Sequence, residues 1–283
     1  MINVDNLTKK YGSNLALNKI NLDLEKGKVY GLVGENGAGK TTLINCIAKV
    51  IKNYSGKIEI ENIKIGFMPQ DAALEEEITA ENLLLFFYLL DDEKNALENV
   101  NKSLKLTDCY DFKDKKIKEL SHGMRRRVMI AQALLHDPEL IILDEPTSGL
   151  DPKVVIEVRG IIKKLKSKGK TLFISSHNTQ DIEDACDYLI FIEKGIIKKK
   201  EKINEYRGNS IIKLLLDKSL SKKEVELLRK IKNIKDVKIN DNEVLISIKD
   251  NNLVNDTINK ITKYNINFVN IRIGREIDDI FKN

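Results

Sequence analysis

The chain has 283 residues, of which 42% are hydrophobic and 32% charged, and 48 Lys and Arg against 43 Asp and Glu give it a net charge of +5 at pH 7. These values indicate a globular protein with one large and one small domain, and the charge excess is too small to predict nucleic-acid binding. Three distant cysteines, Cys46, Cys109 and Cys186, have no C-x-x-C spacing, which excludes a disulfide framework or zinc site and predicts a reducing compartment.

Two segments near the start alternate apolar and polar side chains. Residues 2 to 8 show this pattern, and it returns in residues 15 to 24. A period of two predicts antiparallel strands, here laid beside the main sheet and joined by a turn at Lys10-Tyr11-Gly12.

A phosphate-binding loop follows. The apolar strand Lys28 to Val33 leads into a segment that fits G-x-x-x-x-G-K-[ST], and a helical pattern continues from Thr42 to Ala48. Such a loop turns its backbone N–H groups around an anion, next to the positive end of the helix dipole. The predicted phosphate-binding residues are Gly34, Glu35, Asn36, Gly37, Ala38, Gly39, Lys40, Thr41 and Thr42.

Three side chains near this loop have possible roles in nucleotide binding. Lys40 would reach the terminal phosphates, and the Thr41 hydroxyl would hold Mg²⁺. Tyr11 is placed to stack on an adenine ring, although its position alone suits a surface tyrosine equally well. The loop alone also fits an ordinary Gly-rich turn.

The strand pattern continues at Ile58 to Ile60 and at Ile63 to Met68, and it ends at Pro69-Gln70. Gln70 is either a plain loop residue or a ligand of Mg²⁺ or the attacking water that reports occupancy to a mobile subdomain. From about Ile78 to Lys118 the pattern becomes helical, which predicts an inserted helical subdomain.

The longest apolar run is Leu83 to Leu90, far short of the ~20 residues that span a bilayer. No export signal is visible at the start of the sequence either. The run fits the core of the helical subdomain, and part of it also fits a surface that receives a partner helix.

Two acidic residues end a strand that is apolar throughout. Leu140 to Leu143 reads as a strand buried on both faces, and Asp144-Glu145 follows it. Ligands bind at the carboxyl ends of strands in open α/β sheets, so Asp144 would hold Mg²⁺ and Glu145 would orient or deprotonate the attacking water. The alternative is a structural pair that caps the next helix.

A histidine stands at another strand end. The strand Thr171 to Ser176 stops at His177, which could donate a hydrogen bond to a γ-phosphate, although a lone loop histidine would more commonly be inert.

From residue 210 the pattern restarts. A strand (211–216), a helix (221–231), two strands turned at Asn240-Asp241-Asn242, a helix (253–264) and a strand (266–273) follow one another. The order βαββαβ resembles a ferredoxin-like unit, and a short tail at Glu276 to Phe281 comes after it. No catalytic constellation is visible in this region.

The order of these motifs resembles that of an ATP-binding-cassette (ABC) ATPase. The resemblance covers residues 1 to about 208, and its members are the phosphate loop, Gln70, the segment Leu120 to Met124, Asp144-Glu145, Ser148 to Asp151, and His177. It implies an α/β fold with a mixed sheet, an antiparallel β subdomain and a helical subdomain at about 71–135. The small α+β domain would then occupy 209–283.

The resemblance also implies that two cassettes meet head to tail around two ATP molecules and Mg²⁺. Ser121 and Gly123 would face the partner's γ-phosphate, and Asp151 would cross the interface. Glu145, His177 and Gln70 would serve hydrolysis, and Tyr11 would stack on the adenine. The family's usual LSGGQ reads LSHGM here, so we expect an active site that is weaker than usual.

A single cassette without a membrane span resembles the separate ATPase subunit of a transporter. It would be cytoplasmic, peripheral on the inner face of the cell membrane, paired with itself or a related cassette and docked on integral membrane permease subunits. The short linker and the Ile280-Phe281 tail look most like the drug, bacteriocin or lantibiotic exporter group. The alternatives are an importer ATPase, a non-transport cassette acting on ribosomes or nucleic acid, and a regulatory cassette that only binds ATP.

Overall fold

The computed structural model describes residues 1–90, 94–203, 210–248, 253–264 and 266–275. The chain divides into two compact units, Met1–Lys200 and Glu201–Asn283. The predicted boundary between residues 208 and 209 lies outside the described residues, and so does the predicted tail from Glu276 to Phe281.

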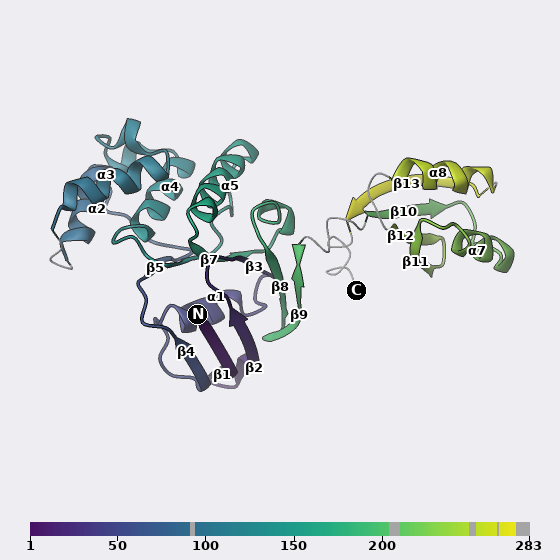
Figure 1. Ribbon diagram of the computed structural model, residues 1–283, viewed down its shortest axis with the longest axis horizontal. Helices are drawn as coiled ribbons and strands as arrows, with labels where there is room; N and C mark the ends of the chain where they lie inside the picture. Colours follow the sequence, from purple (N-terminus) through teal and green to yellow (C-terminus); the bar gives the residue numbers. More distant parts are fainter. Residues whose placement is uncertain (91–93, 204–209, 249–252, 265, 276–283) are drawn as a thin grey trace. The chain divides into compact units, whose positions relative to one another are not determined.

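A six-stranded sheet forms the centre of the first unit (Figure 1). In spatial order its strands are β5 (Ile65–Met68), β6 (Leu140–Leu143), β7 (Thr171–Ser176), β3 (Val29–Val33), β8 (Tyr188–Glu193) and β9 (Ile196–Lys202). The pairings from β5 to β8 are all parallel. Only Lys194 and Gly195 separate β8 from β9, a connection too short for a parallel crossover, so the sheet is mixed as predicted.

The burial of the strands follows their place in the sheet. Every residue of β3, β6 and β7 is buried, as expected for parallel strands covered on both faces. The strands β8 and β9 are absent from the predictions. The last five residues of β9 are charged and most of the strand is exposed, which suits a sheet edge but hides the alternation that marks a strand.

A second sheet in this unit is antiparallel and has the order β2-β1-β4. Its strands are β1 (Ile2–Tyr11), β2 (Asn14–Leu24) and β4 (Ser55–Ile60). The predicted turn is one place too early, because β1 continues through Tyr11 and pairs it with Asn14, while Gly12 (φ 58°) and Ser13 make the turn.

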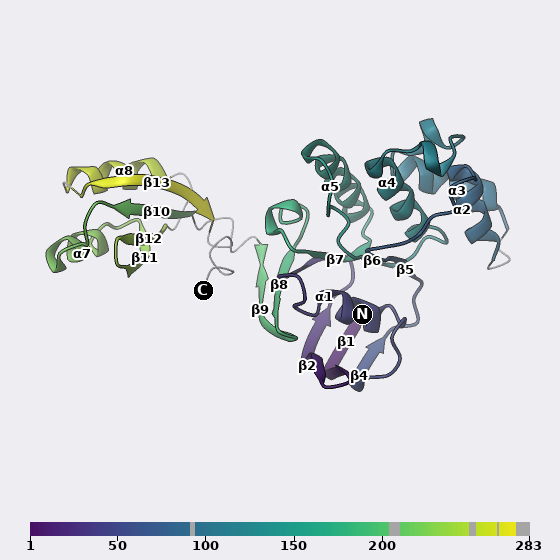
Figure 2. The same cartoon turned by 180° about the vertical axis from the view of Figure 1, so that it is seen from behind.

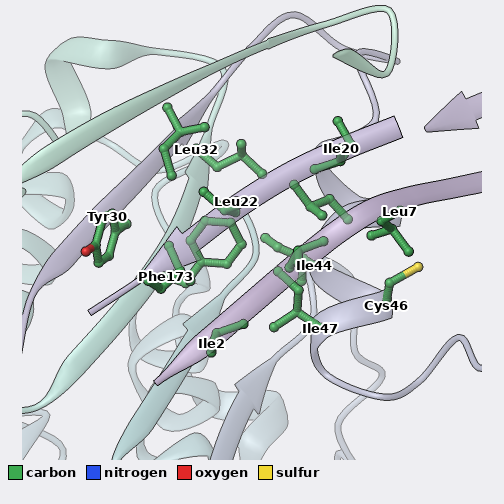
Figure 3. Packing of buried hydrophobic residues seen from close by; sticks show 14 of the residues in the cluster. Ile2, Leu7, Ile20, Leu22, Tyr30, Leu32, Ile44, Cys46, Ile47 and Phe173 are labelled. Atoms are coloured by element: carbon green, nitrogen blue, oxygen red, sulfur yellow. The ribbon is translucent and has the colours of Figure 1, made fainter. Parts of the chain in front are cut away.

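The two sheets enclose one core. Figures 1 and 2 show α1 (Lys40–Ile47) and the antiparallel sheet on one face of the six-stranded sheet, with α4 (His122–Ala133) and α5 (Pro152–Ser167) on the other. Figure 3 shows side chains from the two sheets and α1 packed together, among them Leu22, Ile44 and Phe173. This packing fixes α1, and with it the loop that precedes the helix, against the sheet.

The predicted helical subdomain contains α2 (Ala80–Leu89), α3 (Ala96–Leu106) and α4, with a core of its own. The interpretation of the apolar run as core holds for part of it, and its use as a docking surface stays a prediction. Leu83, Leu84 and Tyr88 are buried in that core, whereas Phe86 is 57% and Leu90 65% exposed. None of the helices that the structure describes has the length and apolarity that a membrane crossing requires.

The second unit has the predicted order of elements. They are β10 (Ser210–Leu216), α7 (Lys222–Arg229), β11 (Ile234–Asn240), β12 (Glu243–Ile248), α8 (Val254–Lys263) and β13 (Phe268–Arg275). The sheet is antiparallel in the order β11-β12-β10-β13, which is the strand order of a ferredoxin-like unit. Alternate residues of β12, which are Val244, Ile246 and Ile248, are buried with both helices in one core.

Candidate active site

The carboxyl ends of four parallel strands lie at one edge of the central sheet. The register pairs Val33 with Ser176, and it pairs Leu143 with both Met68 and Ile174. The segments that follow these strands therefore meet. They carry the phosphate loop, Gln70, the Asp144-Glu145 pair and His177, as the strand ends in the sequence predict.

The phosphate loop depends on glycine at particular places. Gly37 (φ 80°) and Gly39 (φ 105°) have left-handed backbone conformations that disfavour other residues. At Gly34 a Cβ atom would lie 2.4 Å from the carbonyl oxygen of Ile192 in β8, so the loop can approach the sheet only without a side chain. Glycine thus allows both the curvature of the loop and its close approach to β8.

Lys40, the first residue of α1, is folded onto this loop. Its ammonium donates hydrogen bonds to the carbonyl oxygens of Gly34 (2.7 Å) and Glu35 (3.1 Å), and its side chain is only 5% exposed. The same Nζ lies 3.2 Å from Oε1 of Glu145. A buried ammonium with these partners is ready to exchange loop carbonyls for phosphate oxygens.

Asp144 is fully buried at the end of β6. Its Oδ1 accepts a 2.5 Å hydrogen bond from the Ser175 hydroxyl, whereas Oδ2 has no hydrogen-bond partner among the described residues. Burial raises the pKa of this carboxyl, and the hydroxyls of Ser175 and Thr41 act against that rise. An unpartnered buried carboxylate oxygen is what a cation would coordinate.

Glu145 lies between the phosphate loop and His177. One carboxylate oxygen faces Lys40 and the other is 2.8 Å from Nδ1 of His177. The backbone N–H of His177 also donates to Oε2 at 3.4 Å. The carboxylate is buried and held from two sides, whereas the imidazole is half exposed.

A cavity of about 610 Å³ opens over these residues. Predicted residues in its lining are Tyr11, Asn36, Gly37, Gly39, Lys40, Thr41, Thr42, Gln70 and Glu145. The Thr41 hydroxyl and the Gln70 side-chain oxygen are 3.5 Å apart at this wall, and Tyr11 is 49% exposed. Phosphate-binding, acidic and aromatic groups therefore share one pocket of a size that suits a nucleotide.

The comparisons with known proteins agree with this geometry. Residues 17–148 match the family model described as ABC transporter. An uncharacterized ABC transporter ATP-binding protein of Methanocaldococcus jannaschii is 38% identical over 79% of this chain and 86% of its own length. This chain belongs to the ABC transporter ATP-binding proteins.

Two further relatives of this cassette carry transport or resistance in their names. The lantibiotic transport ATP-binding protein of Streptococcus pyogenes is 37% identical over 71% of this chain and 91% of its own. The linearmycin resistance ATP-binding protein of Bacillus subtilis is 30% identical over 96% and 94%. The latter match includes the second unit.

A solved dimeric structure of a post-hydrolysis ATP-binding cassette, bound to ADP and Pi, is similar to this cassette. Its TM-score is 0.65, at 28% identity, and it covers 72% of this chain and 99% of that chain. The family and this neighbour support the fold and ATP hydrolysis.

Gly34, Glu35, Ala38, Asp144 and His177 lie at the same strand ends but do not line the cavity, and three further predicted residues lie at two helix starts. Ser121 caps α4, where its hydroxyl accepts a hydrogen bond from the backbone N–H of Met124 (3.2 Å), and Asp151 precedes α5 without a side-chain cap bond. Gly123 packs so closely on α5 that a Cβ atom would lie 2.6 Å from Val154. These residues occupy the starts of two helices and leave Ser121 exposed.

Several residues of the site were not predicted. Asn14, Leu15, Ala16, Lys194 and Gly195 also line the cavity. Lys194 and Gly195 form the turn between β8 and β9, and Gly195 donates its N–H to the carbonyl of Ala38 (2.9 Å). For Lys194 and Gly195, the glycine of this Lys-Gly pair is the one turn signal in the sequence that could have indicated their position.

A second cavity of about 580 Å³ lies beside the first. It is lined by Gln70, Asp71, Ala72, Ala73, Leu74, Glu76, His122, Arg125, Arg126 and Met129. Gln70 lines both cavities, and the buried Arg126 guanidinium donates to its carbonyl oxygen at 3.0 Å. The loop after β5 is thereby tied to α4.

Proposed function

We propose that this ABC ATPase hydrolyses ATP with Glu145 as the group that activates water, and that it powers export of a drug, peptide or lipid-like substrate. The observation that carries the proposal is the position of Glu145, between the phosphate-loop Lys40 and His177 at the edge of the cavity. A buried carboxylate in hydrogen-bond reach of a histidine suits a general base whose orientation must be fixed.

Each predicted residue has a role in this proposal. The loop from Gly34 to Thr42 holds the phosphates through its N–H groups, and Lys40 gives up loop carbonyls to bind their oxygens. Tyr11 stacks on the adenine. His177 keeps Glu145 in place and donates to the γ-phosphate, so binding of the triphosphate and positioning of the base are linked.

The oxygens near the loop fit a magnesium ion. A hydroxyl (Thr41), an amide oxygen (Gln70) and an unpartnered carboxylate oxygen (Asp144) are the hard ligands that Mg²⁺ prefers. When bound, the ion would neutralise charge on the phosphates. The protein contributes these three oxygens, which it presents at one edge of the sheet.

We propose a head-to-tail pair of cassettes, homodimeric or with a related cassette. Ser121, Gly123 and Asp151 lie at the starts of α4 and α5 and not at the strand ends that carry the nucleotide site of their own chain, which supports a role toward the nucleotide of a partner. The N-terminus of the α4 helix at Ser121 would present the positive end of its dipole to a γ-phosphate. His122 and Met124 replace the usual signature residues, while the two predicted contact residues remain.

Integral membrane permease subunits are the further partners that we propose, with the cassette on the inner face of the cell membrane. The second cavity supports this assignment, because Gln70 lines it and the nucleotide cavity alike. A segment seated there would sense what occupies the nucleotide site. The names of the lantibiotic and linearmycin relatives favour export over import and over action on ribosomes.

Two measurements test the proposal. Purified protein should release phosphate from ATP only when Mg²⁺ is present, and a chelator should stop the release. Affinity capture of the tagged chain from detergent-solubilised membranes should recover integral membrane subunits. Recovery of ribosomal proteins or nucleic acid instead, with salt-sensitive binding, would contradict the transport assignment.

A further inference from the structure

Ser175 is a buried polar residue near the carboxyl end of β7. It lies in β7 after Leu172, Phe173 and Ile174, and its exposed fraction is zero. A hydroxyl in such a place costs free energy unless it is hydrogen-bonded. Its partners therefore show what the residue does.

Both partners of the Ser175 hydroxyl belong to the Asp144-Glu145 pair. Its O–H donates to Oδ1 of Asp144 (2.5 Å), and its oxygen accepts the backbone N–H of Glu145 (2.7 Å). A single oxygen atom thus links the carboxylate of one acidic residue to the main chain of the next. Because Oδ1 is engaged, Oδ2 is the carboxylate oxygen of Asp144 that remains unpartnered.

The main chain at Glu145 needs such a link. Glu145 has φ 50°, a left-handed conformation that is costly for any residue with a Cβ atom. This conformation turns the chain sharply after β6, and the Glu145 side chain meets Lys40 and His177 beyond that turn. A buried backbone N–H at this point must find an acceptor, and the hydroxyl from the neighbouring strand supplies it.

We propose that Ser175 is a positioning residue of the ATPase, which aims Asp144 at the metal and holds the backbone of Glu145 in its left-handed conformation. The inference rests on the roles proposed above for Asp144 and Glu145. It predicts that the hydroxyl governs the response to Mg²⁺ more than the binding of nucleotide, because Ser175 does not line the nucleotide cavity.

The test is a set of variants of the full-length protein. Ser175→Cys keeps the size of the side chain nearly unchanged but replaces the hydroxyl by a weak donor, so it should fold even if Ser175→Ala does not. Ser103→Ala is the matched control. Ser103 is also a buried serine, and its hydroxyl donates to the carbonyl of Ala131 (2.5 Å) in the helical subdomain.

The main readout is the midpoint of thermal unfolding, measured with ADP at increasing Mg²⁺, because a ligand that binds only the folded state raises it. For Ser175→Cys the half-saturating Mg²⁺ concentration should rise by roughly 10- to 100-fold, the usual cost of removing an outer partner of a metal ligand. Stabilisation by ADP without Mg²⁺ should stay at the wild-type level. Turnover of Mg-ATP should fall by a similar factor.

The outcomes distinguish a failure of the proposed metal role of Asp144 from a failure of the proposed role of Ser175. If the wild type gains no stability from Mg²⁺ in the presence of ADP, the proposed metal role of Asp144 fails. If the wild type responds and Ser175→Cys responds at the same Mg²⁺ concentration, Ser175 is only a structural residue and the inference is wrong. A lower unfolding midpoint alone, as expected for Ser103→Ala, does not count as support.

Discussion

The two units of this chain treat buried polar groups differently. The cassette buries Lys40, Asp144, Glu145 and Ser175 within reach of one another, and it holds Glu145 at a positive φ. In the described part of the second unit, Thr257 is the only polar side chain that is fully buried, and its hydroxyl donates to the carbonyl of Leu253, the N-cap residue of its own helix.

This contrast indicates that the catalytic site lies in the cassette and not in the second unit. A scaffold satisfies each buried polar group locally, as the second unit does. An active site keeps charged groups buried, partly unpartnered and close to one another, because they are to act on a ligand. The following experiments test whether the two units really differ in this way, from the largest expected effect to the smallest.

Replacing the buried ammonium should have the largest effect. We expect Lys40→Ala to weaken ATP binding by about 100-fold or more, because charge-assisted hydrogen bonds to phosphate are lost. Titration with a fluorescent ATP analogue measures this affinity. Lys213→Ala in the second unit, which removes a surface ion pair with Glu243 (2.8 Å), should leave the affinity unchanged. Equal loss in both variants would contradict the contrast.

Removing the charge of Glu145, the proposed general base, should separate binding from turnover. We expect Glu145→Gln to bind ATP but to lower phosphate release by roughly 100-fold, the scale of a positioned catalytic base. Size-exclusion chromatography with ATP should then show a trapped dimer. Wild-type turnover in this variant would refute the role of Glu145.

Cutting the chain between the units tests whether the cassette is sufficient. A chain that ends at Ile203 keeps all strands of the central sheet, so it should still bind and hydrolyse ATP. In urea unfolding, the full chain should show a second transition that Mg-ADP does not shift, since the ligand stabilises only the unit that binds it. A short chain without ATPase activity would assign the second unit a direct part in the site.

The smallest effect concerns the cysteines, all of which lie in the cassette. Burial raises the pKa of the Cys46 thiol from 9.0 to about 11. The folded state then binds more protons than the unfolded state between these values, so the free energy of unfolding should fall as pH rises from 9 to 11. Cys46→Ala should make this fall less steep, as measured by urea unfolding at pH 8 and pH 10. An unchanged slope would show that Cys46 does not contribute.

Much of the site was predictable because its residues directly follow buried strands that can be recognised in the sequence. Asp144-Glu145 and His177 each end a buried strand, and parallel strands bring their carboxyl ends to one edge. Ser175 carries no such signal, since its meaning depends on the neighbouring strand. The prediction put Tyr11 in a turn, whereas it ends β1 and pairs with Asn14. The register of the sheet sets this pairing, and the local sequence pattern does not show it.

The ion pair between Lys40 and Glu145 also affects how a nucleotide enters. Before a nucleotide arrives, the Lys40 ammonium offsets the negative charge of the Glu145 carboxylate, which lowers the repulsion that an approaching polyanion meets. In the proposed mechanism the Lys40 ammonium then turns to the phosphate oxygens, and His177 is the partner that the Glu145 carboxylate keeps. The ion pair thus makes release of the proposed general base depend on the arrival of the nucleotide.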